Sequence, residues 1–194
     1  MAVHSINNAL EKVNYKIKDI SFLSSATVGA DLAAPGFANL IQGQLRAAPM
    51  QTMSFQGICA SGVAAMKAAA QVIELQEFKK SIAVATEFPS RLFKASRFQK
   101  IEENLDFDSH FLRWMLSDGS GATLFEDRPN EKGISLKLNW IHLKSFSGDY
   151  PTCMHIGTPW NKPNTSYLDY ASLEEAEKDG SFLLRQDIRL LPNL

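Results

Sequence analysis

The chain has few cysteines, no basic run and no long apolar stretch, and each absence excludes a class of protein. Its only cysteines, Cys59 and Cys153, are too few for a disulfide framework, so we expect reduced thiols and a cytoplasmic chain. The net charge is -1, and without a Lys/Arg cluster we expect no nucleic-acid partner. No apolar stretch is long enough to span a bilayer, and residues 1–16 lack the features of a secretory signal. We therefore expect no membrane partner.

Low-complexity segments and clear repeats are also absent, and what remains is typical of a globular domain. The 194 residues suffice for a sizeable core, and 45% of them are apolar. Predicted helices alternate with predicted short strands. The helices are expected at 5–16, 36–45 and 60–75, and the strands at 20–24, 52–55 and 81–86. This alternation predicts an α/β fold with a parallel sheet and right-handed crossovers.

The second half of the chain has a less regular pattern. We expect further strands at 122–125 and 134–141, with a tight turn at 117–121 before the first of them. Residues 147–170 are rich in Pro, Gly, Asn, Thr and Tyr, which predicts a long irregular stretch. A last helix is expected at 172–185.

Cys59 is the strongest candidate for a functional residue, because it lies between a predicted strand and a predicted helix. Gly57 permits a sharp turn, and the cysteine opens the helix. The free backbone N–H groups and the dipole of a helix start favour a thiolate, the nucleophilic form. Functional groups also collect at the carboxyl ends of parallel strands, where this residue is expected. The alternative is a structural role, since free cysteine often behaves as a small buried hydrophobe.

Several stretches resemble the N-terminal half of a 3-oxoacyl-[acyl carrier protein] synthase III. GICASGVAAMKAA contains Cys59, and DISFLSSATVGADLAAPGFANLIQGQL lies upstream of it. IAVATEFPSR and LSDGSGATLFED follow in the family's order. The later LKLNWIHLKSFSGDYPTCMHIG and LLRQDIRLL resemble a subgroup that forms dialkylresorcinols and related cyclohexanediones. The resemblance covers nearly the whole chain.

This resemblance implies a thiolase-like fold, of which the chain would form one layered α/β/α half with a mixed, mainly parallel sheet. It also implies a ping-pong Claisen condensation. Cys59 takes an acyl group from a thioester, and a second acyl thioester supplies the carbon nucleophile. The implied partners are acyl carrier protein or coenzyme A thioesters and a second copy in a homodimer, with no cofactor. Residues 1–146 would be a core domain, and residues 147–194 an irregular extension toward an absent C-terminal core domain.

The sequence departs from the family in its histidine and asparagine motifs. In the family these residues come from the C-terminal half and stabilise the developing charge. None of the four histidines here lies in a matching context: His4, His110, His142 and His155. We also expect the family's first strand, before Ser5, to be missing. We therefore expect a chain that is catalytically incomplete alone, with a separate C-terminal half as one partner to look for.

Two other functions stay open on the same residues. The chain is alternatively a non-catalytic thiolase-fold subunit or remnant that acts as a structural partner. It is otherwise a transferase that moves an acyl group without forming a carbon–carbon bond. The neighbouring reading frame separates the first alternative from a split enzyme, because a split enzyme needs the histidine and asparagine motifs there.

Other residues are weaker candidates for chemistry. Cys153 and His155 would lie on one side of an extended segment as a dyad, although the surrounding Pro, Thr and Gly favour an ordered loop. Metal-ligand spacings such as CxxC are lacking, so we expect no zinc site. Glu87 follows a predicted strand and is a candidate base, with a surface carboxylate as the alternative.

Basic and aromatic residues are interleaved after residue 87. The basic residues are Arg91, Lys94, Arg97 and Lys100, and the aromatic ones of interest are Phe88 and Phe93. The basic side chains would suit an acidic acyl carrier protein or a phosphopantetheine phosphate, or would form a solvated helix face. The aromatic side chains would line an acyl channel or a dimer contact, or would pack in the core.

Overall fold

The chain folds into two compact units that interleave along the sequence. A computed structural model describes residues 1–99, 107–131, 133–162 and 164–193. The first unit comprises Met1–Glu87 and Gly119–Lys144, and the second comprises Phe88–Asp118 and Ser145–Leu194. The domain boundary at residue 146 stays a prediction, and the compact units change at other places because residues 88–118 join the second unit.

The first unit is built on a four-stranded sheet in the order β2-β1-β3-β4. Its strands are β1 (Phe22–Thr27), β2 (Gln51–Gln56), β3 (Lys80–Glu87) and β4 (Gly119–Glu126). The first three are parallel, and β4 runs antiparallel to β3. The sheet is therefore mixed and mainly parallel. All six residues of β1 are buried, because this strand has neighbours on both sides and helices over both faces.

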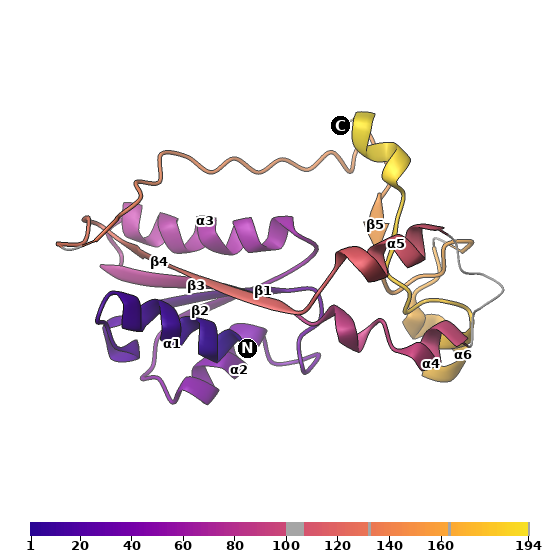
Figure 1. Cartoon of the computed structure of the whole chain (residues 1–194), viewed down its shortest axis with the longest axis horizontal. Helices are drawn as coiled ribbons and strands as arrows, with labels where there is room; N and C mark the ends of the chain where they lie inside the picture. Colours follow the sequence, from indigo (N-terminus) through magenta and orange to yellow (C-terminus); the bar gives the residue numbers. More distant parts are fainter. Residues whose placement is uncertain (100–106, 132, 163, 194) are drawn as a thin grey trace. The chain divides into compact units, whose positions relative to one another are not determined.

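Helices cover both faces of this sheet (Figure 1). On one face lie α1 (Ala2–Lys12) and α2 (Phe37–Leu45), and on the other lies α3 (Ala60–Glu74). Leu23 belongs to the core under α1 and α2, whereas Phe22 belongs to the core under α3. Neighbouring strand residues point to opposite faces, so β1 contributes to both cores. The layered α/β/α arrangement confirms the predicted fold class.

One predicted strand is wrong. No strand is assigned within the described residues 133–144, although the sequence predicts one at 134–141. The side chains of Ile134 and Leu136 are 90% and 93% exposed. The alternation of apolar and polar residues is present, but no strand of the described chain pairs with this segment. A strand without a neighbour has no ladder of hydrogen bonds to hold it.

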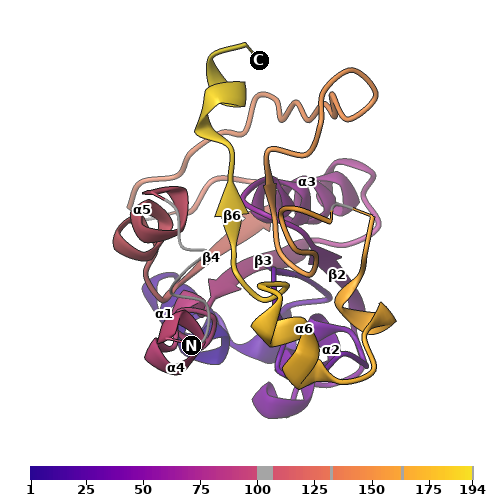
Figure 2. The ribbon, with the colours of Figure 1, turned by 90° about the vertical axis from the view of Figure 1, so that its right-hand side faces the viewer.

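The second unit contains short elements and a small core. Its elements are η2 (Pro89–Arg91), α4 (Ala95–Gln99), α5 (Phe107–Met115), β5 (Met154–His155), η4 (Tyr167–Asp169), α6 (Leu173–Lys178), β6 (Arg185–Gln186) and η5 (Ile188–Asn193). A further short helix, η1 (Ile17–Asp19), belongs to the first unit. β5 and β6 pair antiparallel, and β6 packs on α5 (Figure 2). In the described part of the chain, no helix has both the length and the apolar character of a membrane span.

The predicted helix at 172–185 is also wrong in its extent. The helix α6 ends at Lys178, and Gly180 then adopts a φ of +84°. This left-handed conformation favours glycine and ends a helix. Arg185 consequently lies in β6 and not in a helix.

Candidate functional site

Cys59 is the N-cap residue of α3 and follows the end of β2 by three residues. Its side chain is exposed. Ser61, in the first turn of α3, donates its hydroxyl to the carbonyls of Gly57 and Ile58 at 3.2 and 2.8 Å. The helix start is therefore tied to the turn before it. The structure places this cysteine in the strand–turn–helix setting that the sequence predicts, and its nucleophilic role stays a prediction.

The first turn of α3 has already used part of its donor capacity. The N–H of Ser61 donates to the carbonyl of Ile58 at 2.9 Å, and the N–H of Gly62 donates to that of Cys59 at 3.2 Å. A helix start offers up to four unpaired N–H groups, and here at least two have acceptors. The start of α3 therefore has fewer free N–H groups to offer a ligand than a helix start in which all four are unpaired.

Two buried serines hold α3 against the sheet. Ser24 of β1 donates its hydroxyl to the carbonyl of Ala65 at 2.7 Å, and Ser81 of β3 donates to that of Ala69 at 2.6 Å. Both serines are 0% exposed. These two bonds fix the position of α3 along the direction of the strands. They therefore also fix the position of Cys59 at the start of α3. Sequence reasoning missed both residues, and their only signal was a polar residue inside a predicted buried strand.

The carboxyl ends of the three parallel strands are linked by side chains. Glu87 ends β3, and its Oε1 accepts the N–H of Val28, just beyond β1, at 2.8 Å. Gln56 ends β2, and its Nε2 donates to the carbonyl of Val28 at 3.3 Å. Burial raises the pKa of Glu87, while the Val28 N–H and the Thr27 side chain pull the pKa of this carboxyl down. Two hydrogen bonds therefore connect Glu87, through Val28, to Gln56, the last residue before the turn that contains Cys59.

A charged depression lies at the other end of the sheet. Its volume is about 440 Å³, and its lining includes Glu77, Lys80, Glu126 and Arg128. Lys80 is the first residue of β3 and pairs with Glu126 in register, so the depression lies at the amino end of this strand. Acyl chains bind in mainly apolar cavities. The depression is therefore not a site for the acyl group.

The second unit contains Cys153 and His155. The His155 ring stacks on Trp160, with centroids 5.3 Å apart and planes 7° apart. Burial lowers the pKa of His155, and the positive charge of Arg185 lowers it further. Among the described residues no hydrogen bond joins the Cys153 thiol to this ring. The part of the chain that the structure describes also contains no group of three potential metal ligands.

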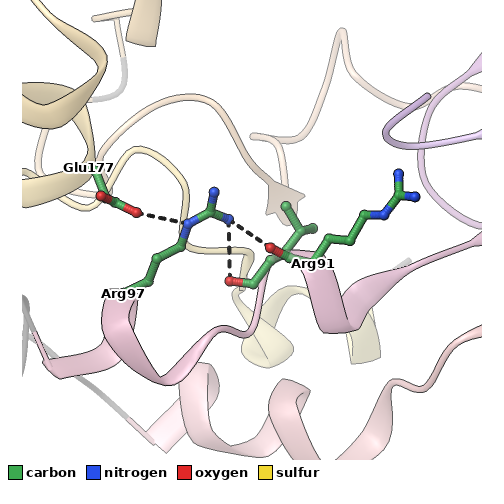
Figure 3. Close-up of polar contacts among 4 residues, drawn as sticks. Arg91, Arg97 and Glu177 are labelled. Carbon is green, nitrogen blue, oxygen red and sulfur yellow. Dashed lines mark hydrogen bonds and ion pairs between the residues drawn. The ribbon is translucent and has the colours of Figure 1, made fainter. Parts of the chain in front are cut away.

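Arg97 has structural partners within the second unit (Figure 3). Its Nε forms an ion pair with Glu177 Oε1 of α6 at 2.9 Å. Its Nη1 donates to the carbonyls of Arg91 and Leu92 at 3.1 and 3.4 Å. The Arg97 side chain is only 21% exposed. This arginine therefore ties α4 to α6 and to the segment before α4, which leaves little of it for an acidic partner.

The other basic and aromatic candidates are spread over different environments. The Arg91 guanidinium lies over the Phe88 ring at 4.7 Å, and Lys94 is exposed. Lys100 lies outside the described residues. Phe93 packs against the small core around Phe98, which supports core packing for this aromatic residue.

The fold defines a class of protein, a thiolase-like layered α/β/α fold, and solved structures show the same arrangement. OleA of Xanthomonas campestris with bound cerulenin superimposes with a TM-score of 0.57 at 22% identity, covering 63% of this chain and 38% of OleA. A cysteine-to-serine variant of OleA with bound lauric acid and lauroyl-CoA gives a TM-score of 0.54 at 20% identity and the same coverage. At this identity the likeness shows the fold.

Curated proteins that are similar in sequence give a more specific comparison than the fold does. The beta-ketoacyl-[acyl-carrier-protein] synthase III of Oceanobacillus iheyensis is 28% identical over 134 residues, which are 69% of this chain and 39% of the relative. That of Clostridium kluyveri is 23% identical over 166 residues, 86% of this chain and 46% of the relative. No protein-family model matches the chain. The chain is related to the synthase III proteins and spans less than half the length of these curated relatives.

Proposed function

We propose that the chain is the nucleophile-bearing part of an acyltransferase of the ketoacyl synthase III type. Cys59 takes an acyl group from a thioester, and a Claisen condensation with a second acyl thioester follows. The observation that carries this proposal is the exposed Cys59 at the start of α3, at the carboxyl edge of parallel strands, in a chain related to synthase III proteins. The cytoplasmic location stays a prediction.

The loading step needs a thiolate, an open approach and a rigid support. The sulfur attacks the thioester carbonyl, a C–S bond forms, and the carrier thiolate leaves and takes up a proton. Exposure of Cys59 gives the approach, and the Ser24 and Ser81 bonds to α3 give the support. Acyl carrier protein or coenzyme A thioesters are the proposed donors. The OleA variant with bound lauroyl-CoA supports this substrate class.

Condensation needs a histidine and an asparagine, and the described residues hydrogen-bond neither of them to the cysteine. Among the described residues no histidine is hydrogen-bonded to the Cys59 thiol, and His4 of α1 contacts Asn8 instead. We propose that a histidine and an asparagine come from a C-terminal half. The exposed apolar side chains between Ile134 and Trp140 support a partner of this kind, because large exposed apolar surface marks interaction sites.

A second copy of the chain is the other proposed partner. β2 lies at one edge of the four-stranded sheet, and an edge strand presents unpaired N–H and C=O groups to a partner strand. Met53 of β2 and Val63 of α3 are each 40% exposed. We propose a homodimer in which two β2 edges meet. A purely monomeric mass by light scattering at about 100 μM would contradict it, since obligate interfaces persist at such concentrations.

The experiment that tests the function measures coenzyme A released from lauroyl-CoA. The wild-type chain is expected to release about one equivalent and then stop, because it can load an acyl group but lacks the condensing groups. Cys153→Ala is the matched control and should release the same amount, whereas Cys59→Ala should release none. Coenzyme A release by the Cys59→Ala variant would contradict the assignment of Cys59 as the nucleophile. Sustained condensation by the wild-type chain would contradict the proposal that the chain alone is catalytically incomplete.

One alternative function has an observation in its favour. The chain spans 39% of the Oceanobacillus relative, and no imidazole of the described residues is hydrogen-bonded to Cys59. Both facts also suit a non-catalytic subunit that acts as a structural partner. Such a subunit would release no coenzyme A in the experiment above. A transferase without carbon–carbon bond formation would instead load Cys59 and pass the acyl group to an added thiol.

A further inference from the structure

Glu87 is a carboxylate at the Cys59 edge of the sheet that the loading step does not use. It ends β3 and is partly buried. Its pKa is set by burial and by two neighbours, the Val28 N–H and the Thr27 side chain. Its neighbours are therefore neutral donors from the end of β1. A carboxylate that accepts bonds from fixed donors is well placed to hold backbone in position.

The bonds from Glu87 lead by two steps to the cysteine turn. Val28 is held on both sides, since its N–H donates to Glu87 at 2.8 Å and its carbonyl accepts from Gln56 at 3.3 Å. Gln56 is the last residue of β2, and Gly57, Ile58 and Cys59 follow it directly. The end of β1 is thus clamped between the ends of its two neighbours in the sheet, on the side where the cysteine lies.

We infer that Glu87 is a positioning residue for the Cys59 turn. Its carboxylate anchors Val28, Val28 anchors the Gln56 side chain, and Gln56 fixes where the chain leaves β2 to form the turn. This inference rests on the proposed function and deepens it, because it gives the acyl-loading cysteine a support that does not touch the substrate. A general base in contact with the thiol is the competing role for the same carboxylate.

The geometry favours positioning over proton transfer. The first turn of α3 lies over the end of β3, with Gly62 beside Ala85, but among the described residues no hydrogen bond joins the Glu87 carboxylate to the Cys59 thiol. A general base must come within about 3 Å of the atom it deprotonates. The Oε1 of Glu87 is also already engaged by the Val28 N–H.

The test measures how fast iodoacetamide alkylates Cys59, in a Cys153→Ala background so that only one thiol reacts. Glu87→Ala and Gln56→Ala should each slow the reaction by about two- to five-fold, the size of a helix-start contribution. The double variant should be no slower than either single one, because residues acting through one chain of contacts are not additive. Glu87→Gln keeps an acceptor oxygen at the same reach and should recover most of the lost rate.

Glu126→Ala is the matched control. This carboxylate accepts the Tyr15 hydroxyl at 2.9 Å and lies at the opposite end of the same sheet. Like Glu87→Ala, the Glu126→Ala variant loses one carboxylate charge and one hydrogen bond, but its Cys59 alkylation rate should equal that of the parent. Amide exchange supplies a second measurement, since the Val28 N–H should lose protection in Glu87→Ala and keep it in Glu87→Gln.

Each contrary result has a definite meaning. If Glu87→Gln is as slow as Glu87→Ala, the carboxylate acts through its charge or its proton and the positioning role is wrong. Strictly additive effects, unchanged rates, or an equal loss in Glu126→Ala would overturn it as well. Failure of the proposed function can be told apart from failure of the positioning role. If no coenzyme A is released, the proposed function is wrong, but the alkylation rates still show whether Glu87 positions the Cys59 turn.

Discussion

At the scale of single residues, polar groups inside the first unit do most to place the candidate nucleophile. Burying a hydroxyl costs free energy unless it finds a partner, and Ser24 and Ser81 find theirs in carbonyls of α3. Each such bond contributes about 1 kcal/mol. The larger consequence is positional, because apolar packing lets a helix slide whereas two directional bonds do not. Cys59 inherits this position as the N-cap of α3.

His155 makes the stability of the second unit depend on pH. Its pKa in the folded chain is lowered by burial and by Arg185, so the folded state disfavours the charged ring. The stabilisation from a neutral ring is complete above the ordinary histidine pKa of 6.5 and is lost as pH falls below it, because the unfolded chain then binds the proton more readily.

Denaturant unfolding at pH 7.5 and pH 5.5 measures this dependence, followed by Trp160 fluorescence in a Trp114→Phe, Trp140→Phe background. The wild-type second unit should be less stable at the lower pH, and His155→Gln should reduce the difference. His142→Gln is the control, since His142 is exposed in the first unit. A wild-type stability that rises on acidification would contradict the sign of the pKa shift.

Among single residues, the sequence predicts the setting of Cys59 but not its supports. A glycine, a cysteine and a run of small residues after a short strand are local signals, and local geometry follows from them. The contact between Val28 and Glu87 joins residues 59 positions apart, and no local pattern encodes it. Glu87 could be nominated as a carboxylate after a strand, whereas its role depended on partners that only the fold brings together.

At the scale of elements, predictions succeed where the chain supplies the neighbour that a segment pairs with or packs against. The strands of the parallel sheet and the helix α3 are found within a few residues of their predicted ends, because their apolar patterns match surroundings that exist in the chain. The strand predicted at 134–141 fails for the opposite reason. Its pattern is suitable, but pairing is a property of two segments, and the described residues supply no neighbour.

The exposed segment 134–141 should tolerate polar substitution. Leu136 is 93% exposed, so Leu136→Lys should change the free energy of unfolding by less than about 0.5 kcal/mol. The same change should lower the binding of an apolar dye and slow aggregation, because it interrupts an exposed apolar stripe. Leu10→Lys is the contrast, since Leu10 is 3% exposed in the core and should destabilise the first unit strongly. A loss above 1 kcal/mol in Leu136→Lys would show that this segment packs.

At the scale of the whole molecule, the chain combines a layered α/β/α unit with exposed surfaces that are typical of interaction sites. The sheet ends at β2 on one side, apolar side chains are exposed after β4, and the synthase III relatives are more than twice as long as the matched part. The edge strand and the exposed apolar side chains are the observations that support the two proposed partners, a second copy and a C-terminal half. On the proposed function, we expect loading of Cys59 to be the part of the reaction that this unit performs by itself.

The most direct measurement of the central claim is to find which residue carries the acyl group. The wild-type chain is incubated briefly with lauroyl-CoA, digested, and mapped by mass spectrometry. We predict one lauroyl group on the peptide that contains Cys59, removable by hydroxylamine as a thioester, and none on the peptide that contains Cys153. A lauroyl group on Cys153, or an unmodified Cys59 after prolonged incubation, would contradict the account.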